Sequence, residues 1–398
     1  MKKALATILA LVMAIGLCSV SWATESALPT AENGVIKLTE NVTLTERWEV
    51  AANTEITLDL NGYSITSAGQ VIMNNGKLTI TDNKGGGKIV STGSQAIGVG
   101  SNSVTNIQKA IVESVEGAVI TGRAIGAIIN IYDGTFSASD NAVIAGNGSD
   151  REGTGNTINI SGGVFNGKIT TPGYVACGIY APWKDNINVT GGTFNITGGA
   201  GIVARAGNVT VTNAVFNTTG NATGKVGDSR VVVPCSAIVF DSQANYPAMN
   251  NDSVIHVVSG KFNSEMNAVS MIKNDNETDR VAVTGGTFST DVKEYLAEGK
   301  ILQKNGDTYT AVTNSGITSG TYTAKPTVPD GYKVVENTDG TFTVEKVGGY
   351  YYYQPTTDTK ANDTKGSPKT FDAGIALYVG MALTSAAGVA FVGKKRED

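Results

Sequence analysis

The chain has 398 residues, of which 41% are hydrophobic, 7% aromatic and 16% charged, and its net charge is −5. No basic patch stands out along the sequence, which argues against nucleic acid as a partner. The 49 glycines, together with recurring Val, Ile, Thr and Asn, favour an all-β fold with many tight turns over a helical one.

Residues 1–23 have the pattern of a secretory signal peptide. Lys2 and Lys3 precede an apolar run from Ala4 to Leu17, and Ser21-Trp22-Ala23 forms a small-x-small cleavage site. We therefore expect export of the chain and cleavage after Ala23.

Residues 24–290 are expected to form one repetitive β domain. A strand of alternating apolar and polar residues, a Gly-rich corner and a phenylalanine recur in the same order six times. The repeats begin at Ile129, Ile158, Ile187, Val209, Ile255 and Val281 and contain Phe136, Phe165, Phe194, Phe216, Phe262 and Phe288. Most repeats are about 22 to 29 residues long, and one is about 46 residues long.

A second apolar strand lies between consecutive copies, for example at Gly178-Ile179-Tyr180 and Gly201-Ile202-Val203. This repeat length, with period-2 strands and no helical pattern, predicts a right-handed parallel β-helix. Equivalent residues would lie about 4.8 Å apart along the axis. The first residues of the repeats would then form one inward ladder, and the phenylalanines would stack at one corner. A β-sandwich or a series of hairpins is the alternative architecture.

The N-terminal third follows the same scheme less regularly. Strand-and-turn units occur at Ile56–Tyr63 and Lys77–Asp82, after an alternating stretch from Val35 to Leu44. With the later Gly-Gly-Thr-Phe units, residues 34–290 resemble the pectate-lyase-like β-helix domains on surface proteins of anaerobic, often gut-dwelling, Firmicutes. The resemblance implies the fold, and its motifs specify activity far less well.

Residues 291–347 are expected to cap the open end of the solenoid, which would otherwise expose strand edges. Val292–Leu296 is predicted as a short helix, Ile301–Val312 as a hairpin around Asn305-Gly306, and Tyr332–Val347 as a hairpin around Asp339-Gly340. Residues 348–366, rich in Thr, Asp and Lys, are predicted as a solvated stalk.

Residues 367–398 have the order of a sorting signal. Ser367-Pro368-Lys369-Thr370-Phe371 precedes an apolar run at 373–393, which is long enough for a transmembrane helix, and basic residues follow it. This tail resembles those of sortase-anchored surface proteins of Gram-positive bacteria. The resemblance implies that a sortase cuts after Thr370 and links the protein to peptidoglycan at the cell surface. Ser367 and Phe371 depart from the commonest pattern, Leu-Pro-x-Thr-Gly, so an uncleaved membrane anchor remains the alternative.

No catalytic, cofactor or metal site is expected. Glycoside hydrolysis needs paired carboxylates, and the Asp-Asp and Gly-His-Gly motifs of polygalacturonase-like enzymes do not occur in the sequence. His256 falls at the strand position that Asn130, Asn159 and Asn188 occupy in other repeats, so we expect it in an exposed polar ladder. Stacked amides hydrogen-bond one another along such a ladder.

Candidate ligand contacts are Tyr174, Tyr180 and Trp183, because aromatic faces suit sugar stacking or protein contact. Loops at 217–230 and 241–253 could also bind a partner. Cys177 and Cys235 precede equivalent strands two coils apart, so their Cα atoms should lie about 10 Å apart and the thiols should be free.

These features predict a surface protein, anchored in the cell wall or membrane, that displays a β-helix for adhesion or for contact with polysaccharide or host protein. A polysaccharide lyase or glycosidase and a passive surface spacer are the alternatives.

Overall fold

The computed structural model describes residues 27–122, 124–139, 141–146, 155–227, 232–243, 253–273 and 280–348. The chain divides into two units at Val347, and the described residues belong almost entirely to the first. The predicted signal peptide, nearly all of the stalk, the motif Ser367–Phe371 and the apolar run 373–393 lie outside the described residues. Among the described residues, no helix is long and apolar enough to cross a membrane.

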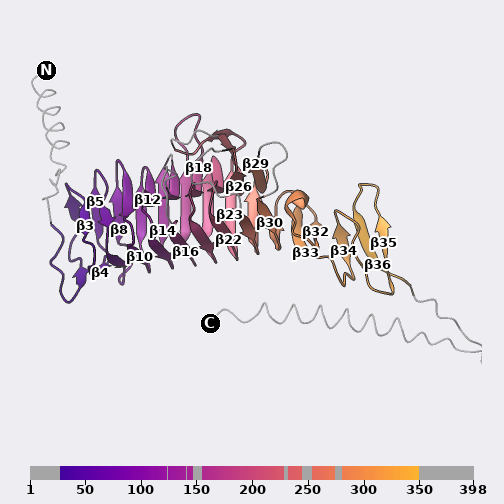
Figure 1. Ribbon diagram of the computed structural model, residues 1–398, viewed down its shortest axis with the longest axis horizontal. Coiled ribbons are helices and arrows are strands. Elements are labelled where there is room, and N and C mark those ends of the chain that lie inside the picture. Colours follow the sequence, from indigo (N-terminus) through magenta and orange to yellow (C-terminus); the bar gives the residue numbers. More distant parts are fainter. Residues whose placement is uncertain are drawn as a thin grey trace, which may run out of the picture. The chain divides into compact units, whose positions relative to one another are not determined.

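The first unit is a parallel β-solenoid of the right-handed type with about nine turns, so the predicted fold class is confirmed for this unit. Each complete coil contributes one strand to each of three sheets, which we name A, B and C, and the coils stack in sequence order (Figure 1). The last coil contributes β30 and β31 to sheets A and B alone.

Sheet A consists, in spatial order, of β1 (Val35–Lys37), β4 (Glu55–Asp59), β7 (Lys77–Thr81), β10 (Val104–Ile107), β13 (Ile128–Ile131), β16 (Thr157–Ile160), β19 (Asn186–Val189), β22 (Asn208–Val211), β27 (Ile255–Val257) and β30 (Val281–Val283). The parallel part of sheet B consists of β2 (Val42–Leu44), β5 (Ser64–Ser67), β8 (Lys88–Ser91), β11 (Ile111–Ser114), β14 (Thr135–Ser139), β17 (Val164–Lys168), β20 (Thr193–Thr197), β23 (Ala214–Thr219), β28 (Gly260–Ser264) and β31 (Gly286–Phe288). Sheet C consists of β3 (Trp48–Val50), β6 (Ile72–Asn74), β9 (Gln95–Val99), β12 (Gly117–Gly122), β15 (Ala142–Gly146), β18 (Ala176–Ala181), β21 (Gly199–Ala204), β26 (Ile238–Asp241) and β29 (Val269–Ile272).

The predicted apolar ladder on sheet A is confirmed. Ile129 pairs with Ile158, and the register continues through Ile187, Val209, Ile255 and Val281. All six side chains are buried. Because successive side chains of a strand point to opposite faces, the residue that follows each of these six in its own strand points out to solvent.

The six phenylalanines form the predicted stack, with neighbouring ring centroids 4.4 to 5.5 Å apart and ring planes within 8 to 11° of parallel. The stack lies on the inward face of sheet B and not at a corner as expected. The reason is visible at Gly192, whose φ of +95° makes the turn before Phe194. The chain has therefore already entered β20 when it reaches the ring.

Each coil has three strands, whereas the sequence indicated two. The segment from Ile158 to Phe165 was expected to be one strand followed by a corner, but it spans β16 and the start of β17. The corner between these strands, Ser161-Gly162-Gly163, is so short that the two strands are easily taken for one in the sequence, although the buried positions change from even numbers in β16 to odd numbers in β17.

Sheet B changes from parallel to antiparallel pairing after β31. Its order continues through β33 (Thr308–Thr313), β32 (Lys300–Asn305), β34 (Gly320–Tyr322), β36 (Phe342–Lys346) and β35 (Tyr332–Glu336). The two predicted hairpins are thus confirmed, and the predicted helix is a single 3-10 turn, η1 (Lys293–Tyr295). This segment ends the solenoid by adding strands to its last coil, and it has a small core of its own around Ile301, Tyr322 and Val344.

A second apolar cluster lies on the outer face of sheet C. Residues of β18, β21 and β26 pack there against the antiparallel hairpin of β24 (Thr223–Lys225) and β25 (Val232–Pro234). Cys177 and Cys235 belong to this cluster and are free, as predicted. The long repeat therefore uses part of its extra length to cover sheet C, with β24 inside the predicted loop 217–230 and β25 just after it.

Candidate functional site

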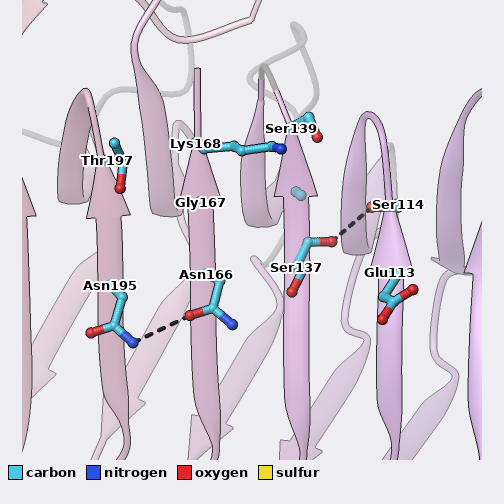
Figure 2. A pocket seen from close by; sticks show the side chains of 10 residues that line it. Glu113, Ser114, Ser137, Ser139, Asn166, Gly167, Lys168, Asn195 and Thr197 are labelled. Atoms are coloured by element: carbon cyan, nitrogen blue, oxygen red, sulfur yellow. Dashed lines mark hydrogen bonds between the residues drawn. The ribbon is translucent and has the colours of Figure 1, made fainter. Parts of the chain in front are cut away.

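A groove crosses the outer face of sheet B over four successive coils. It has a volume of about 490 Å³. Its lining side chains come from β11, β14, β17 and β20 (Figure 2). They include Glu113, Ser137, Ser139, Asn166, Lys168, Asn195 and Thr197.

The alternation of each strand explains why these side chains face the groove. Phe165 points into the core, so Asn166 points out, and Lys168 follows on the same outer face. The register places Ser137 beside Asn166 and Asn166 beside Asn195. Phenylalanine packing inside thus fixes the position of the polar row outside.

The polar row is an amide ladder that the sequence analysis missed. The Nδ2 atom of Asn195 donates a hydrogen bond to Oδ1 of Asn166 at 3.2 Å, and Asn217 and Asn263 each donate to the preceding asparagine at 2.9 Å. Every donor points toward the N-terminal end of the solenoid. The repeated Phe-Asn dipeptide, as at Phe165-Asn166 and Phe194-Asn195, was the signal that could have revealed it.

The ladder stops inside the groove. In the coil that precedes Asn166, the equivalent position of the row is Ser137, and in the coil before that it is Glu113. Figure 2 shows the Asn166 amide nitrogen turned toward the strand that carries Ser137. Within the described part of the chain, neither that nitrogen nor the Ser137 hydroxyl forms a hydrogen bond, so both remain available to a ligand.

One carboxylate and one ammonium group border the groove. Glu113 forms an ion pair with Lys88 at 2.9 Å, which compensates its charge. Lys168 forms no ion pair with any described residue. The groove therefore offers mainly hydroxyl, amide and ammonium donors with a single compensated anion.

A similar ladder on sheet A confirms the expected role of the Ile-Asn-Ile strands. Asn130, Asn159 and Asn188 each donate to the asparagine or equivalent residue of the preceding coil at 2.8 to 2.9 Å. His256 pairs with Thr210 in the same row and is exposed, as predicted. This row stabilises the stacking of coils.

The three aromatic residues proposed as ligand contacts lie in different surroundings. Trp183 is 1% exposed, so its ring presents no face to solvent. Tyr180 is half-buried, and the Arg205 guanidinium donates a hydrogen bond to its hydroxyl and lies 5.2 Å from its ring centroid. Tyr174 is partly exposed and forms an isolated bridge with Lys225. Their ligand contact stays a prediction.

A buried ion pair and a buried carboxylate lie in the coils near these aromatics. Arg205 and Asp241 form an ion pair at 2.7 Å with both side chains fully buried. Asp185 accepts hydrogen bonds from the backbone and side chain of Asn156. Burial raises the pKa of Asp185 because it removes the water that would solvate the carboxylate.

A smaller hollow of about 380 Å³ lies on the outer face of sheet C in the N-terminal coils, over Met73, Gly98 and Ile120. Gln70 reaches across Gly98 there and accepts a hydrogen bond from Arg47. Across the described ranges, no three His, Cys, Asp or Glu residues are grouped so that they could hold a metal ion.

No protein family, no curated protein and no solved structure matches this chain. The function is therefore argued from the groove and from the sequence.

Proposed function

We propose that the protein is an exported surface protein whose solenoid binds polysaccharide through the groove on sheet B, without cleaving it. The observation that carries this proposal is the set of hydrogen-bonding groups in the groove that have no partner within the described chain. They are held on a sheet, so little conformational entropy is lost in ordering them when a ligand binds.

The composition of the groove favours sugar over protein as the ligand. Protein interfaces are usually centred on buried aromatic or Arg anchors, whereas this groove is lined by hydroxyl and amide groups. It also crosses three steps between neighbouring strands, or roughly 14 Å, which gives room for a chain ligand.

Binding is favoured over cleavage by the charges in the groove. Glycosidases commonly use two carboxylates, one on each side of the scissile bond. Glu113 is the carboxylate that lines the groove, and it is paired with Lys88. A polysaccharide-degrading enzyme remains the alternative, and a passive spacer is the second alternative.

The cell-surface location rests on the sequence. The signal peptide, the motif Ser367–Phe371 and the apolar run 373–393 support export followed by sortase linkage to peptidoglycan. Thr370→Ala should move the protein from the wall fraction to the membrane fraction. Unchanged wall attachment would mean that the pentapeptide is not a sortase site and would leave a permanent membrane anchor.

Glycan binding is tested with the full-length protein in detergent on an array of neutral, amino-sugar and acidic polysaccharides, with reducing-end release measured in parallel. We expect binding without release. The double variant Asn166→Ala/Lys168→Ala should lose binding, while Asn159→Ala, a matched change in the sheet A ladder, should retain it. Release of reducing ends would establish an enzyme, and absence of all binding would favour the spacer.

A further inference from the structure

The amide ladder on sheet B has a gap at Ser137. At each coil from Asn195 to Asn263, an amide donates to the preceding coil, and Asn195 and Asn217 also accept from the following one. Asn166 accepts from Asn195, but the next side chain is a serine, too short to continue the row.

The gap has a donor on one side and an acceptor on the other. Asn166 offers Nδ2 from one neighbouring coil, and Glu113 offers its carboxylate from the other. These two residues are two strand steps apart, about 9.6 Å. Asn166 and Asn217 have the same separation, and the amide of Asn195 fits between them with both of its hydrogen bonds formed.

We propose that the groove binds the acetamido group of an N-acetylated amino sugar, which lies above Ser137 between Asn166 and Glu113. This inference rests on the proposed glycan binding and names its ligand class. The acetamido carbonyl accepts a hydrogen bond from Asn166 Nδ2, and its N–H donates to the Glu113 carboxylate, so the ligand continues the polarity of the ladder.

Charge agrees with a neutral amide at this position. Lys88 contacts Oε1 of Glu113, and the second carboxylate oxygen remains for the ligand N–H. A hydrogen bond to an ionised acceptor is stronger than one between neutral groups. A second anion in the gap would instead meet the Glu113 carboxylate at short range.

The surroundings of the gap favour a sugar over the amide of a peptide. Ser139, Lys168 and Thr197 line the same groove two residues further along their strands and offer further hydrogen-bond donors. An Asn or Gln side chain of a peptide would fill the gap but would leave these groups without partners.

The test is calorimetric titration of the full-length protein with two probes, the tetramer of N-acetylglucosamine and the tetramer of glucose. We expect the acetylated tetramer to bind at least about tenfold more tightly. Ser137→Asn fills the gap with the protein's own amide and should abolish this preference. Asparagine already occupies the equivalent position in four coils, so the variant should fold, and its unfolding midpoint checks this.

Two control variants isolate the gap. Ser137→Ala removes the hydroxyl but leaves the gap open, so the preference for the acetylated tetramer over the glucose tetramer should persist. Thr210→Asn extends the sheet A ladder in the same way, away from the groove, and should also leave binding unchanged.

Each outcome is decisive. Equal binding of both tetramers, unaffected by Ser137→Asn, would overturn the acetamido site and leave polysaccharide binding standing. Competition by a glutamine-containing peptide as strong as that by the sugar would overturn the sugar class. Failure of every glycan on the array to bind would overturn the proposed function itself.

Discussion

The phenylalanine stack should contribute more to stability at its centre than at its end. Phe194 is fully buried between Phe165 at 4.4 Å and Phe216 at 4.6 Å between ring centroids. Phe136 ends the stack, with Phe165 at 5.0 Å on one side and Val112 in register on the other. Both rings are completely excluded from solvent, so burial is matched and the number of stacked partners differs.

Replacing each ring by leucine removes the stacking and keeps most of the volume. A stacked aromatic pair is worth roughly 0.5 to 1.5 kcal/mol beyond its buried area. Phe194→Leu should therefore lower the free energy of unfolding by roughly 0.5 to 1.5 kcal/mol more than Phe136→Leu. Phe194→Ala, which also leaves a cavity, should cost about 3 to 5 kcal/mol.

Urea unfolding followed by far-ultraviolet circular dichroism measures these differences. In a solenoid, each coil contacts mainly its neighbours, so a central defect can also separate the unfolding of the two halves. Equal losses for Phe194→Leu and Phe136→Leu would show that the stack contributes only through buried volume, and the argument from ring pairing would be wrong.

Three further predictions concern titratable groups. Burial opposes ionisation of Asp59, but hydrogen bonds from Asn83 and Asn61 lower its pKa overall. The ionised Asp59 therefore stabilises the fold above its unfolded pKa, and this stabilisation is lost as the pH falls through the folded pKa. Asp59→Asn should make the urea midpoint depend less on pH between pH 5 and about 2. The pKa of Asp185 is raised by burial, so its contribution is complete below the unfolded value of 3.8 and declines as pH rises through the folded pKa. Asp185→Asn should then raise the midpoint more at pH 7 than at pH 4, and a larger gain at pH 4 would contradict the assignment. Burial raises the pKa of Cys177 to about 12, so iodoacetamide at pH 8 should label the Cys177 peptide slowly in the folded protein and rapidly in urea, without reductant.

The covering of sheet C explains why sheet B carries the open groove. The outer face of sheet C is apolar from Ala145 to Val239, and the hairpin of β24 and β25 covers part of it. The outer face of sheet B over the same coils carries the asparagine row, which needs no cover because its amides satisfy one another. The polar face is therefore the one that remains available to a ligand.

The sequence alone determined the class of fold and the register of the repeats. The period-2 alternation and the repeat length indicated a parallel solenoid, and aligning the repeats placed Ile129 beside Ile158 and kept Cys177 and Cys235 unpaired. The turn sequences Asn305-Gly306 and Asp339-Gly340 located both C-terminal hairpins. Side-chain alternation and turn residues encode the strands and hairpins locally, and comparison of one repeat with the next supplies the register.

Only the tertiary structure decided which polar and aromatic side chains are accessible. The alternation of apolar and polar residues predicts that Asn166 points away from the core. The direction of its hydrogen bond and the gap at Ser137 depend on neighbouring coils more than 20 residues away in the sequence. Trp183 appeared to be a surface aromatic until packing between coils buried it. The groove exists because strands distant in sequence lie side by side, and that proximity is set by the stacking of coils rather than by any local pattern.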